Sequence, residues 1–144
     1  MALNIINARE TDIPVCVAIY VAAYQAAPYN ACWDEGTAER IIREVMRAYP
    51  EDCFVAEMAG EVVGFALCST LAGMRATIEE FAVRPEYQGQ GVGEAMLKHV
   101  VERYRRQGLR VLELIANKNA PAWEFYEKRG FRESQEYRLM SLEL

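Results

Sequence analysis

A glycine-rich loop between a strand and a helix constrains this chain more than any other feature. Residues 75–83 have a strand pattern, and residues 92–108 carry apolar side chains at helical spacing. Every second position of the loop between them is a glycine: Gly89, Gly91 and Gly93. Without side chains the backbone can approach a ligand closely, and the free amides at a helix start favour an anion. The loop therefore predicts a phosphate site made of main chain, with Gln88 and Gln90 as neutral donors.

The spacing of these glycines differs from the two common nucleotide motifs. The dinucleotide fingerprint needs a glycine or alanine three positions after its second glycine, where this chain has Glu94. The nucleotide P-loop needs Gly-Lys-Ser or Gly-Lys-Thr, which does not follow here. Glycines that simply form a tight turn remain an alternative at this point.

The rest of the chain predicts alternating strands and helices. Strands are expected at 3–8, 53–58, 62–71, 75–83 and 109–115, with one or two more within 131–144. Helices are expected from Thr11 or Asp12, from a Thr37 cap to Pro50, over 92–108 and over 119–129. With 144 residues, we expect a single domain over 1–144, of the α/β or α+β class with helices on the faces of a sheet.

Composition excludes several functional classes. The chain has 16 basic and 21 acidic residues, a net charge of −5, so a nucleic-acid partner is not expected. No apolar stretch reaches the roughly 18 residues of a membrane helix, and the start lacks a signal-peptide pattern. Four cysteines without Cys-x-x-Cys spacing and one histidine predict buried thiols, no metal site and a cytoplasmic location.

Two segments resemble the GNAT superfamily of N-acetyltransferases. Within residues 81–93, Gln88, Gly91 and Gly93 match its Gln/Arg-x-x-Gly-x-Gly/Ala signature. Residues 119–131 are similar to its Asn-x-x-Ala-x-x-Phe-Tyr-x-x-x-Gly-Phe motif. The resemblance implies a mixed, largely antiparallel sheet of six to seven strands with helices on both faces. It also implies a splay between the fourth and fifth strands, which we place between residues 81–83 and 112–115.

The resemblance further implies acetyl-CoA as the acetyl donor. Its pyrophosphate would be held by the loop, namely Gln88, Gly89, Gln90, Gly91, Val92 and Gly93. Its pantetheine arm would pair with the main chain of Phe81 and Val83, because an arm with two amides can act as an extra strand. Asn119 would hydrogen-bond the same arm, and a plain helix cap is the alternative for that residue.

Three side chains are catalytic candidates under the resemblance. Tyr126 matches the tyrosine near the thioester sulfur, where it would donate a hydrogen bond and a proton; a core aromatic is the alternative. Glu80 or Glu79 would be the general base, with a slight preference for Glu80, and a solvated strand face is the alternative for each. Strand alternation puts Glu80 and Glu79 on opposite faces until a bulge intervenes. His99 is expected to be a packing or surface residue.

The acceptor of the acetyl group is less constrained. Tyr24, Tyr29, Trp33 and Asp34 are candidates for an amine site from their position, with anchoring of the loop as the alternative. A polyamine, an amino acid, an aminoglycoside-like antibiotic and a protein amino terminus all remain open, and the resemblance also allows a homodimer. The competing functions are a non-catalytic acyl-CoA sensor or partner module, and a nucleotide- or nucleic-acid-binding domain.

Overall fold

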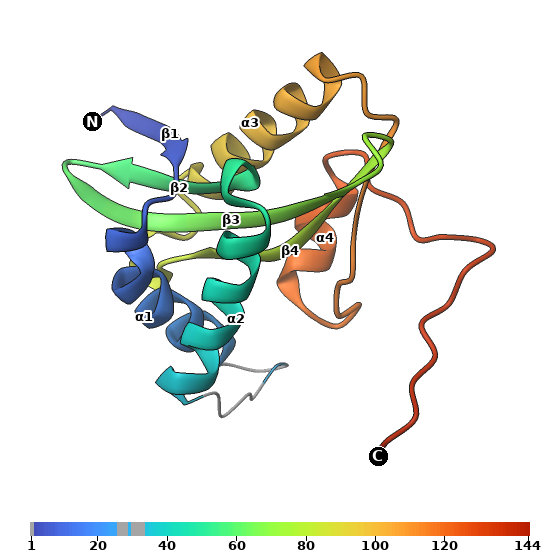
Figure 1. Cartoon of the computed structure of the whole chain (residues 1–144), viewed down its shortest axis with the longest axis horizontal. Coiled ribbons are helices and arrows are strands. Elements are labelled where there is room, and N and C mark those ends of the chain that lie inside the picture. The colour runs from blue at the N-terminus through green and yellow to red at the C-terminus, as the bar shows by residue number, and fades with distance from the viewer. Residues whose placement is uncertain (1, 26–28, 30–33) are drawn as a thin grey trace.

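A five-stranded mixed sheet organises the described part of the chain (Figure 1). This computed structural model describes residues 2–25, 29 and 34–144, so Trp33 and Cys32 lie outside the described residues. The strands lie side by side in chain order: β1 (Leu3–Asn7), β2 (Cys53–Met58), β3 (Glu61–Leu71), β4 (Arg75–Val83) and β5 (Val111–Leu114). The first four are antiparallel to their neighbours, and β5 runs parallel to β4. The mixed, largely antiparallel sheet is confirmed, with five strands where six to seven were expected.

The β2–β3 hairpin has the turn that its sequence predicts. Ala59 and Gly60 have φ values of 53° and 80°. Two consecutive positive φ angles in a two-residue loop match the right-handed twist of the flanking strands. The strand bounds of this hairpin differ from the expectation by one residue, since β3 begins at Glu61.

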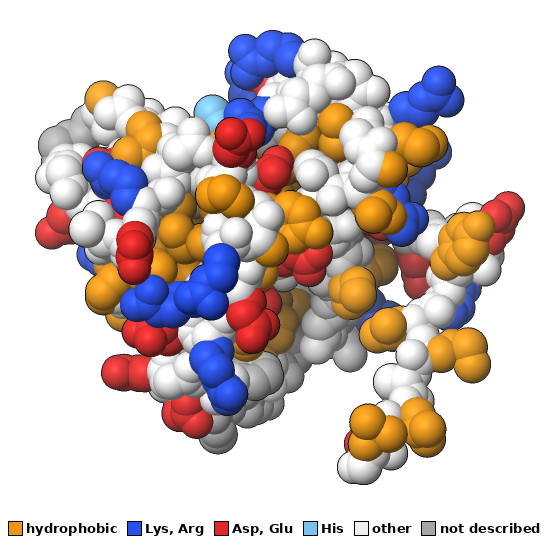
Figure 2. Space-filling view, viewed as in Figure 1, with side chains coloured by type: hydrophobic (Ala, Val, Ile, Leu, Met, Phe, Trp, Pro, Cys, Tyr) orange, Lys and Arg blue, Asp and Glu red, His pale blue; other side chains and the backbone are white. Residues whose placement is uncertain are grey.

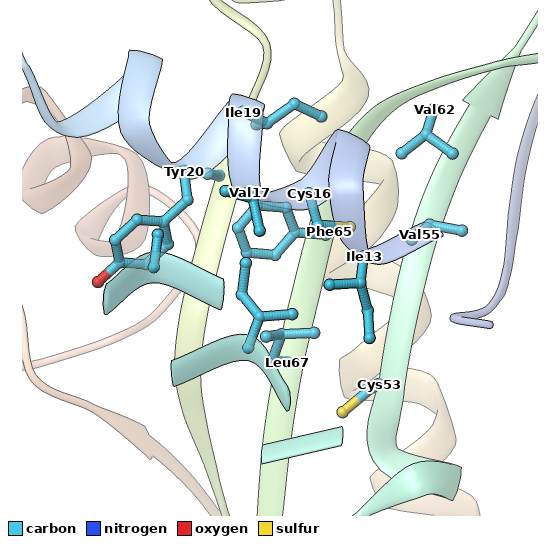
Figure 3. Packing of buried hydrophobic residues seen from close by; sticks show 13 residues of the cluster. Ile13, Cys16, Val17, Ile19, Tyr20, Cys53, Val55, Val62, Phe65 and Leu67 are labelled. Atoms are coloured by element: carbon cyan, nitrogen blue, oxygen red, sulfur yellow. The ribbon is translucent and has the colours of Figure 1, made fainter. Parts of the chain in front are cut away.

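Helices cover both faces of the sheet, as expected. α1 (Ile13–Tyr24) and α2 (Glu35–Ala48) pack on one face, where Tyr20 and Phe65 belong to the same buried cluster (Figure 3). α3 (Val92–Arg106) and α4 (Pro121–Glu127) pack on the other face. Three short 3₁₀ turns complete the order: η1 (Glu10–Asp12), η2 (Pro50–Asp52) and η3 (Pro85–Tyr87).

The cap of α2 differs from the sequence expectation. Asp34 is the N-cap, and its Oδ1 accepts a hydrogen bond from the Thr37 amide at 2.6 Å. Thr37 was therefore the wrong cap, because a carboxylate three residues earlier both accepts the amide and complements the helix dipole. This contact lowers the pKa of Asp34 and gives its carboxylate a structural role.

A β-bulge in β4 reverses the faces to which its side chains point. Leu67 pairs with Glu80 and Cys68 with Ile78, so Glu79 has no residue opposite it on β3. Before the bulge, Ile78 packs in the cluster under α3 and α4. After it, Ala82 packs in the cluster under α1 and α2. By alternation Glu80 shares the face of Ala82, and the bulge thereby turns Glu80 toward α1.

The pairing of β4 with β5 is short. It joins Arg75–Ile78 to Val111–Leu114, and the rest of β4 has no β5 partner. We call the space beside residues 79–83 of β4 the β4–β5 gap. The predicted splay between the fourth and fifth strands is confirmed.

The last predicted strands are absent from the described chain. Residues 131–144 contain no strand. Phe131 still packs on the Tyr126 ring, and beyond it the segment leaves the body of the fold (Figures 1 and 2). Its hydrogen bonds are local: the Ser134 hydroxyl accepts from the Tyr137 amide at 2.9 Å, and Arg138 donates to the Ser134 carbonyl at 2.7 Å. The expectation of one or two last strands was wrong for the described chain, because a strand forms only by pairing and apolar alternation alone does not supply a partner. Met140 and Leu142 are accordingly exposed.

The described cysteines are buried free thiols. Cys16, Cys53 and Cys68 form no disulfide, and burial raises the pKa of each, to about 12 for Cys16 and about 11 for Cys53. This confirms the prediction for these three residues. No helix in the described residues has the length and apolar character needed to span a membrane.

Replacing Gly64 by alanine should destabilise the fold. A Cβ there would lie 3.0 Å from the Ala82 carbonyl oxygen, a backbone atom of β4 that cannot easily move. We expect thermal or urea unfolding to show a loss of about 1–3 kcal/mol. Gly36→Ala is the matched control, because its Cβ would meet Asp34 only at 3.4 Å in the first turn of α2. An unchanged stability for Gly64→Ala would contradict this packing.

Candidate active site

The loop between β4 and α3 leaves open space at its glycines. Gly89 and Gly91 have φ values of 77° and 88°, in the region that favours glycine, and Gly91 is the N-cap of α3. A Cβ built at either position would meet nothing within 4 Å. These two glycines are therefore required by the backbone conformation and not by crowding.

A run of backbone amides in this loop is available to a ligand. Among the described residues, no acceptor takes the amides of residues 89–94, and the first amide used is that of Ala95, which donates to the Gly91 carbonyl at 3.0 Å. Free amides at the start of the 15-residue α3 give the positive end of its dipole. The arrangement suits an anionic group such as a phosphate.

The two glutamine side chains brace the loop. Gln88 Nε2 donates to the Val83 carbonyl at 3.1 Å, and Gln90 Nε2 donates to the Glu86 carbonyl at 3.0 Å. Each amide nitrogen retains a second hydrogen for a ligand. Val92 is buried, and a Cβ on Gly93 would touch the Phe125 ring at 3.4 Å, so these two positions also hold α3 against its neighbours.

Phe81 and Val83 turn their main-chain polar groups toward the β4–β5 gap. The Arg84 amide donates to the Val63 carbonyl at 2.8 Å, which makes Arg84 a hydrogen-bonded position of the β3–β4 pair. In an antiparallel pair such positions alternate with positions whose amides point the other way. Phe81 and Val83 occupy those positions, on the edge that β5 leaves unpaired.

Asn119 does not cap α4. The N-cap is Ala120, and the Asn119 amide donates to Asn117 Oδ1 at 2.9 Å. The helix begins at Pro121, two residues later than expected, because the Asn117 turn precedes it. The exposed Asn119 side chain stays a predicted pantetheine contact.

Tyr126 lies among aromatic rings at the α4 side of the gap. It is 8% exposed, and its ring centroid lies 6.0 Å from that of Phe81 and 5.2 Å from that of Phe125. Burial, and then Tyr29 and Cys68, raise the pKa of the phenol. The side chain is thus both a packed aromatic and a neutral hydrogen-bond donor.

Glu80 is a partly buried carboxylate on the α1 side. Burial raises its pKa to about 7, the Tyr20 hydroxyl opposes this by donating to Glu80 Oε1 at 3.4 Å, and Glu79 adds to the rise. Glu79 itself is exposed and accepts a hydrogen bond from the Ser69 hydroxyl at 2.6 Å. The bulge thus separates two adjacent glutamates into a partly buried group and an exposed group.

A row of tyrosines adjoins Glu80. The ring centroids of Tyr20 and Tyr24 are 4.8 Å apart, as are those of Tyr24 and Tyr29. The pKa of Tyr24 is raised by burial and then by the charge of Glu80, Tyr29, Tyr20 and Tyr126. Tyr24 and Tyr29 stay predicted amine-site residues, whereas the Asp34 carboxylate is occupied in the α2 cap. Sequence reasoning missed Tyr20, although its i, i+4 spacing from Tyr24 on a helix was a usable signal. In Figure 3 its hydroxyl points out of the apolar cluster.

A groove of about 740 Å³ opens between α1 and the glycine-rich loop. Its lining comes from two places: Ala18, Ile19 and Ala22 on α1, and Arg84, Pro85, Glu86, Tyr87 and Gln90 after β4. This volume is within the usual range for small-molecule sites.

His99 packs its ring on Phe54, with the ring centroids 4.9 Å apart, as expected, and lies away from this groove. Within the described residues no group of three or more His, Cys, Asp or Glu side chains is placed to bind a metal ion.

A family model described as the acetyltransferase (GNAT) family matches residues 18–131. The chain belongs to the GNAT family. This is the family that the two sequence motifs indicated.

Three relatives illustrate the range of this family. An uncharacterised N-acetyltransferase of Methanocaldococcus jannaschii is 28% identical over 136 residues, which are 90% of this chain and 60% of that protein. This chain thus spans less than two thirds of that relative. The ribosomal protein bS18-alanine N-acetyltransferase of Escherichia coli is 28% identical over 134 residues, which are 92% of this chain and 83% of that enzyme. A crystal structure of that E. coli enzyme has a TM-score of 0.76 at 27% identity, covering 93% of this chain and 80% of that one. The L-methionine sulfoximine/L-methionine sulfone acetyltransferase of Pseudomonas aeruginosa is 30% identical over 142 residues, which are 91% of this chain and 81% of that enzyme.

Glu80→Gln should remove a pH-dependent loss of stability. The folded-state pKa of about 7 lies above the value of 4.5 for a free glutamate, so the folded protein binds more protons than the unfolded chain between these values. Its free energy of unfolding therefore falls as pH rises from about 5 to 8. We expect the variant to gain roughly 3 kcal/mol on the wild type over that interval, measured by urea unfolding. Glu79→Gln, at the surface, should keep the wild-type dependence; parallel curves for Glu80→Gln would contradict the burial of this charge.

Proposed function

We propose that the protein transfers an acetyl group to a primary amine in the β4–β5 gap, with Glu80 as general base and Tyr126 as proton donor. The observation that carries this proposal is the pair of groups on opposite sides of the gap. Glu80 comes from the α1 side with a pKa of about 7, and Tyr126 comes from the α4 side as a neutral phenol. A base that titrates near neutral pH is well matched to removing a proton from an amine.

Several features support the proposed binding of acetyl-CoA. The free amides of residues 89–94 suit its pyrophosphate, with Gln88 and Gln90 as further donors. The unpaired edge at Phe81 and Val83 suits the two amides of pantetheine. We also propose Asn119 as a contact to that arm, because its side chain is exposed at the start of α4.

The proposed reaction is a direct attack on the thioester. The unprotonated amine nitrogen forms a bond to the carbonyl carbon, and the bond from that carbon to sulfur breaks. The surplus proton on nitrogen passes to the Glu80 carboxylate. The leaving sulfur receives a proton from Tyr126, which recovers it from solvent. An ammonium with a pKa near 10.4 must first lose one proton to solvent, which costs about 4.6 kcal/mol at pH 7. Glu80 then takes the second proton, which the nitrogen loses as its bond to carbon forms.

Two relatives suggest different acceptors. The E. coli enzyme is named for an alanine of a ribosomal protein, and the Pseudomonas enzyme for methionine sulfoximine and methionine sulfone. An amine on a protein or on a small molecule is therefore proposed for this chain. We further propose that residues 1–144 act as one domain, and the buried thiols of Cys16, Cys53 and Cys68 agree with a reducing, cytoplasmic location.

Acetyl-CoA binding and thiol release with a panel of amines test the proposal. We expect calorimetry to show binding, and at least one amine to increase the release of free coenzyme A thiol. Binding without release for any amine would instead favour the non-catalytic sensor. Absence of binding would remove the proposal altogether.

Gly91→Glu should abolish acetyl-CoA binding. The substitution puts a negative side chain in the open space beside the free amides. Gly60→Glu is the matched control, because Gly60 has a φ of 80° against 88° for Gly91, equally open surroundings and a position in the β2–β3 turn. Both variants should therefore carry a similar backbone strain of about 1–2 kcal/mol. Calorimetry should show binding for Gly60→Glu alone; equal affinities would contradict the placement of the phosphate site.

Tyr126→Phe should lower kcat by about 100-fold and change the Kd for acetyl-CoA little, since only a proton donor is lost. Steady-state kinetics with calorimetry separates the two quantities. Tyr104→Phe is a suitable control: Tyr104 is also buried, and its hydroxyl donates to Asp52 Oδ1 at 2.7 Å, away from the gap. The control should lose stability and keep kcat. An unchanged kcat for Tyr126→Phe would reduce Tyr126 to a packing role.

A further inference from the structure

The acceptor side of the gap is built from aromatic rings around one carboxylate. Tyr20, Tyr24 and Tyr29 form a row of rings at 4.8 Å spacings, and the Tyr20 hydroxyl contacts Glu80. Tyr20 in turn stacks on the buried Phe65 ring, which fixes the row to the core.

Glu80 and Glu79 give this surface negative charge. Among the described residues, no lysine or arginine influences the pKa of Glu80 or of Tyr126, and Glu79 adds a second negative charge. The nearby Arg84 side chain pairs with Glu61 on β3 at 3.6 Å. An acceptor amine reaching Glu80 thus meets carboxylate and ring faces, both of which favour a cation.

A free α-amino acid presents a second charge to this surface. Its carboxylate is attached to the carbon that bears the amine, so it would lie on the order of 5 Å from Glu80 once the amine reaches that base. Two like charges at this distance in a partly buried site repel by an amount that corresponds to roughly a hundredfold in kcat/KM. Masking the acid as an amide removes the repulsion and leaves the amine in place.

We propose, on the basis of the function given above, that the acceptor is an amine with no adjacent carboxylate, such as the amino terminus of a peptide. Glu80 and the row of Tyr20, Tyr24 and Tyr29 select this class. Free amino acids are rejected by charge and not by size.

Matched pairs of free amino acids and their amides test this selectivity. Glycine, alanine, methionine, phenylalanine and lysine are each compared with the corresponding amide, with kcat/KM expressed per concentration of unprotonated amine. We expect every pair that reacts to favour the amide by roughly a hundredfold. A preference below about tenfold, or one for the free acid, would overturn the proposal while leaving acetyl transfer itself intact. If acetyl-CoA binds and no amine in any pair is acetylated, acetyl transfer and the proposed selectivity are both wrong.

Variants at Tyr24 test the cause of the selectivity. Tyr24→Arg supplies a cation beside Glu80, and the preference for the amide should fall by about tenfold or more. Tyr24→Phe keeps the ring and adds no charge, so its preference should match the wild type. An equal fall in both variants would show that ring packing, and not charge, sets the preference. Circular dichroism checks that both variants fold, and the wild-type ratios decide the proposal if Tyr24→Arg does not.

Discussion

One extra residue in β4 sets the geometry on which the rest of the site depends. The bulge at Glu79 lets Ile78 pack under α3, while Glu80 two positions later points to α1. Without it, strict alternation would put Glu80 on the face of Ile78 and away from Tyr20. The pairing with β5 stops at the same point, so the change of face and the opening of the sheet coincide. A local irregularity thus places a carboxylate and an unpaired strand edge together.

Burying the Glu80 carboxylate has an energetic cost that the surroundings only partly offset. The Tyr20 hydroxyl stabilises the charged form, but at 3.4 Å it is a weak contact, and Glu79 works against it. A well-satisfied carboxylate would have a low pKa and would be a poor base at neutral pH. Incomplete compensation therefore keeps the group near the pH at which it can exchange a proton. The cost is consistent with a functional group and has no benefit for folding.

The sequence was most informative where interactions between residues close together in the chain determine the structure. The bounds of β4, the 59–60 turn and the glycine-rich loop follow from alternation, turn chemistry and positive φ. The splay followed from the family resemblance. The prediction of strands within residues 131–144 was wrong because strand pairing depends on residues far apart in the chain. The prediction of the α2 cap was wrong because both Asp34 and Thr37 are residue types that can cap a helix. The distinct environments of Glu79 and Glu80 required the register of β3, which no pattern in β4 reveals.

The glycine-rich loop and the acceptor side of the site rest on different physical principles. This difference explains why the sequence predicted the loop more easily than the acceptor side. The proposed phosphate site uses main chain, so its signature is the absence of side chains and can be read directly from Gly89 and Gly91. The acceptor side uses side chains from α1, β4 and α4 that meet only after folding. A site of the first kind keeps its ligand through many sequence changes elsewhere, because the free amides of residues 89–94 do not depend on residue type. A site of the second kind changes its preference when one ring or charge is replaced, so the proposed selectivity would depend on Glu80 and on the row of Tyr20, Tyr24 and Tyr29.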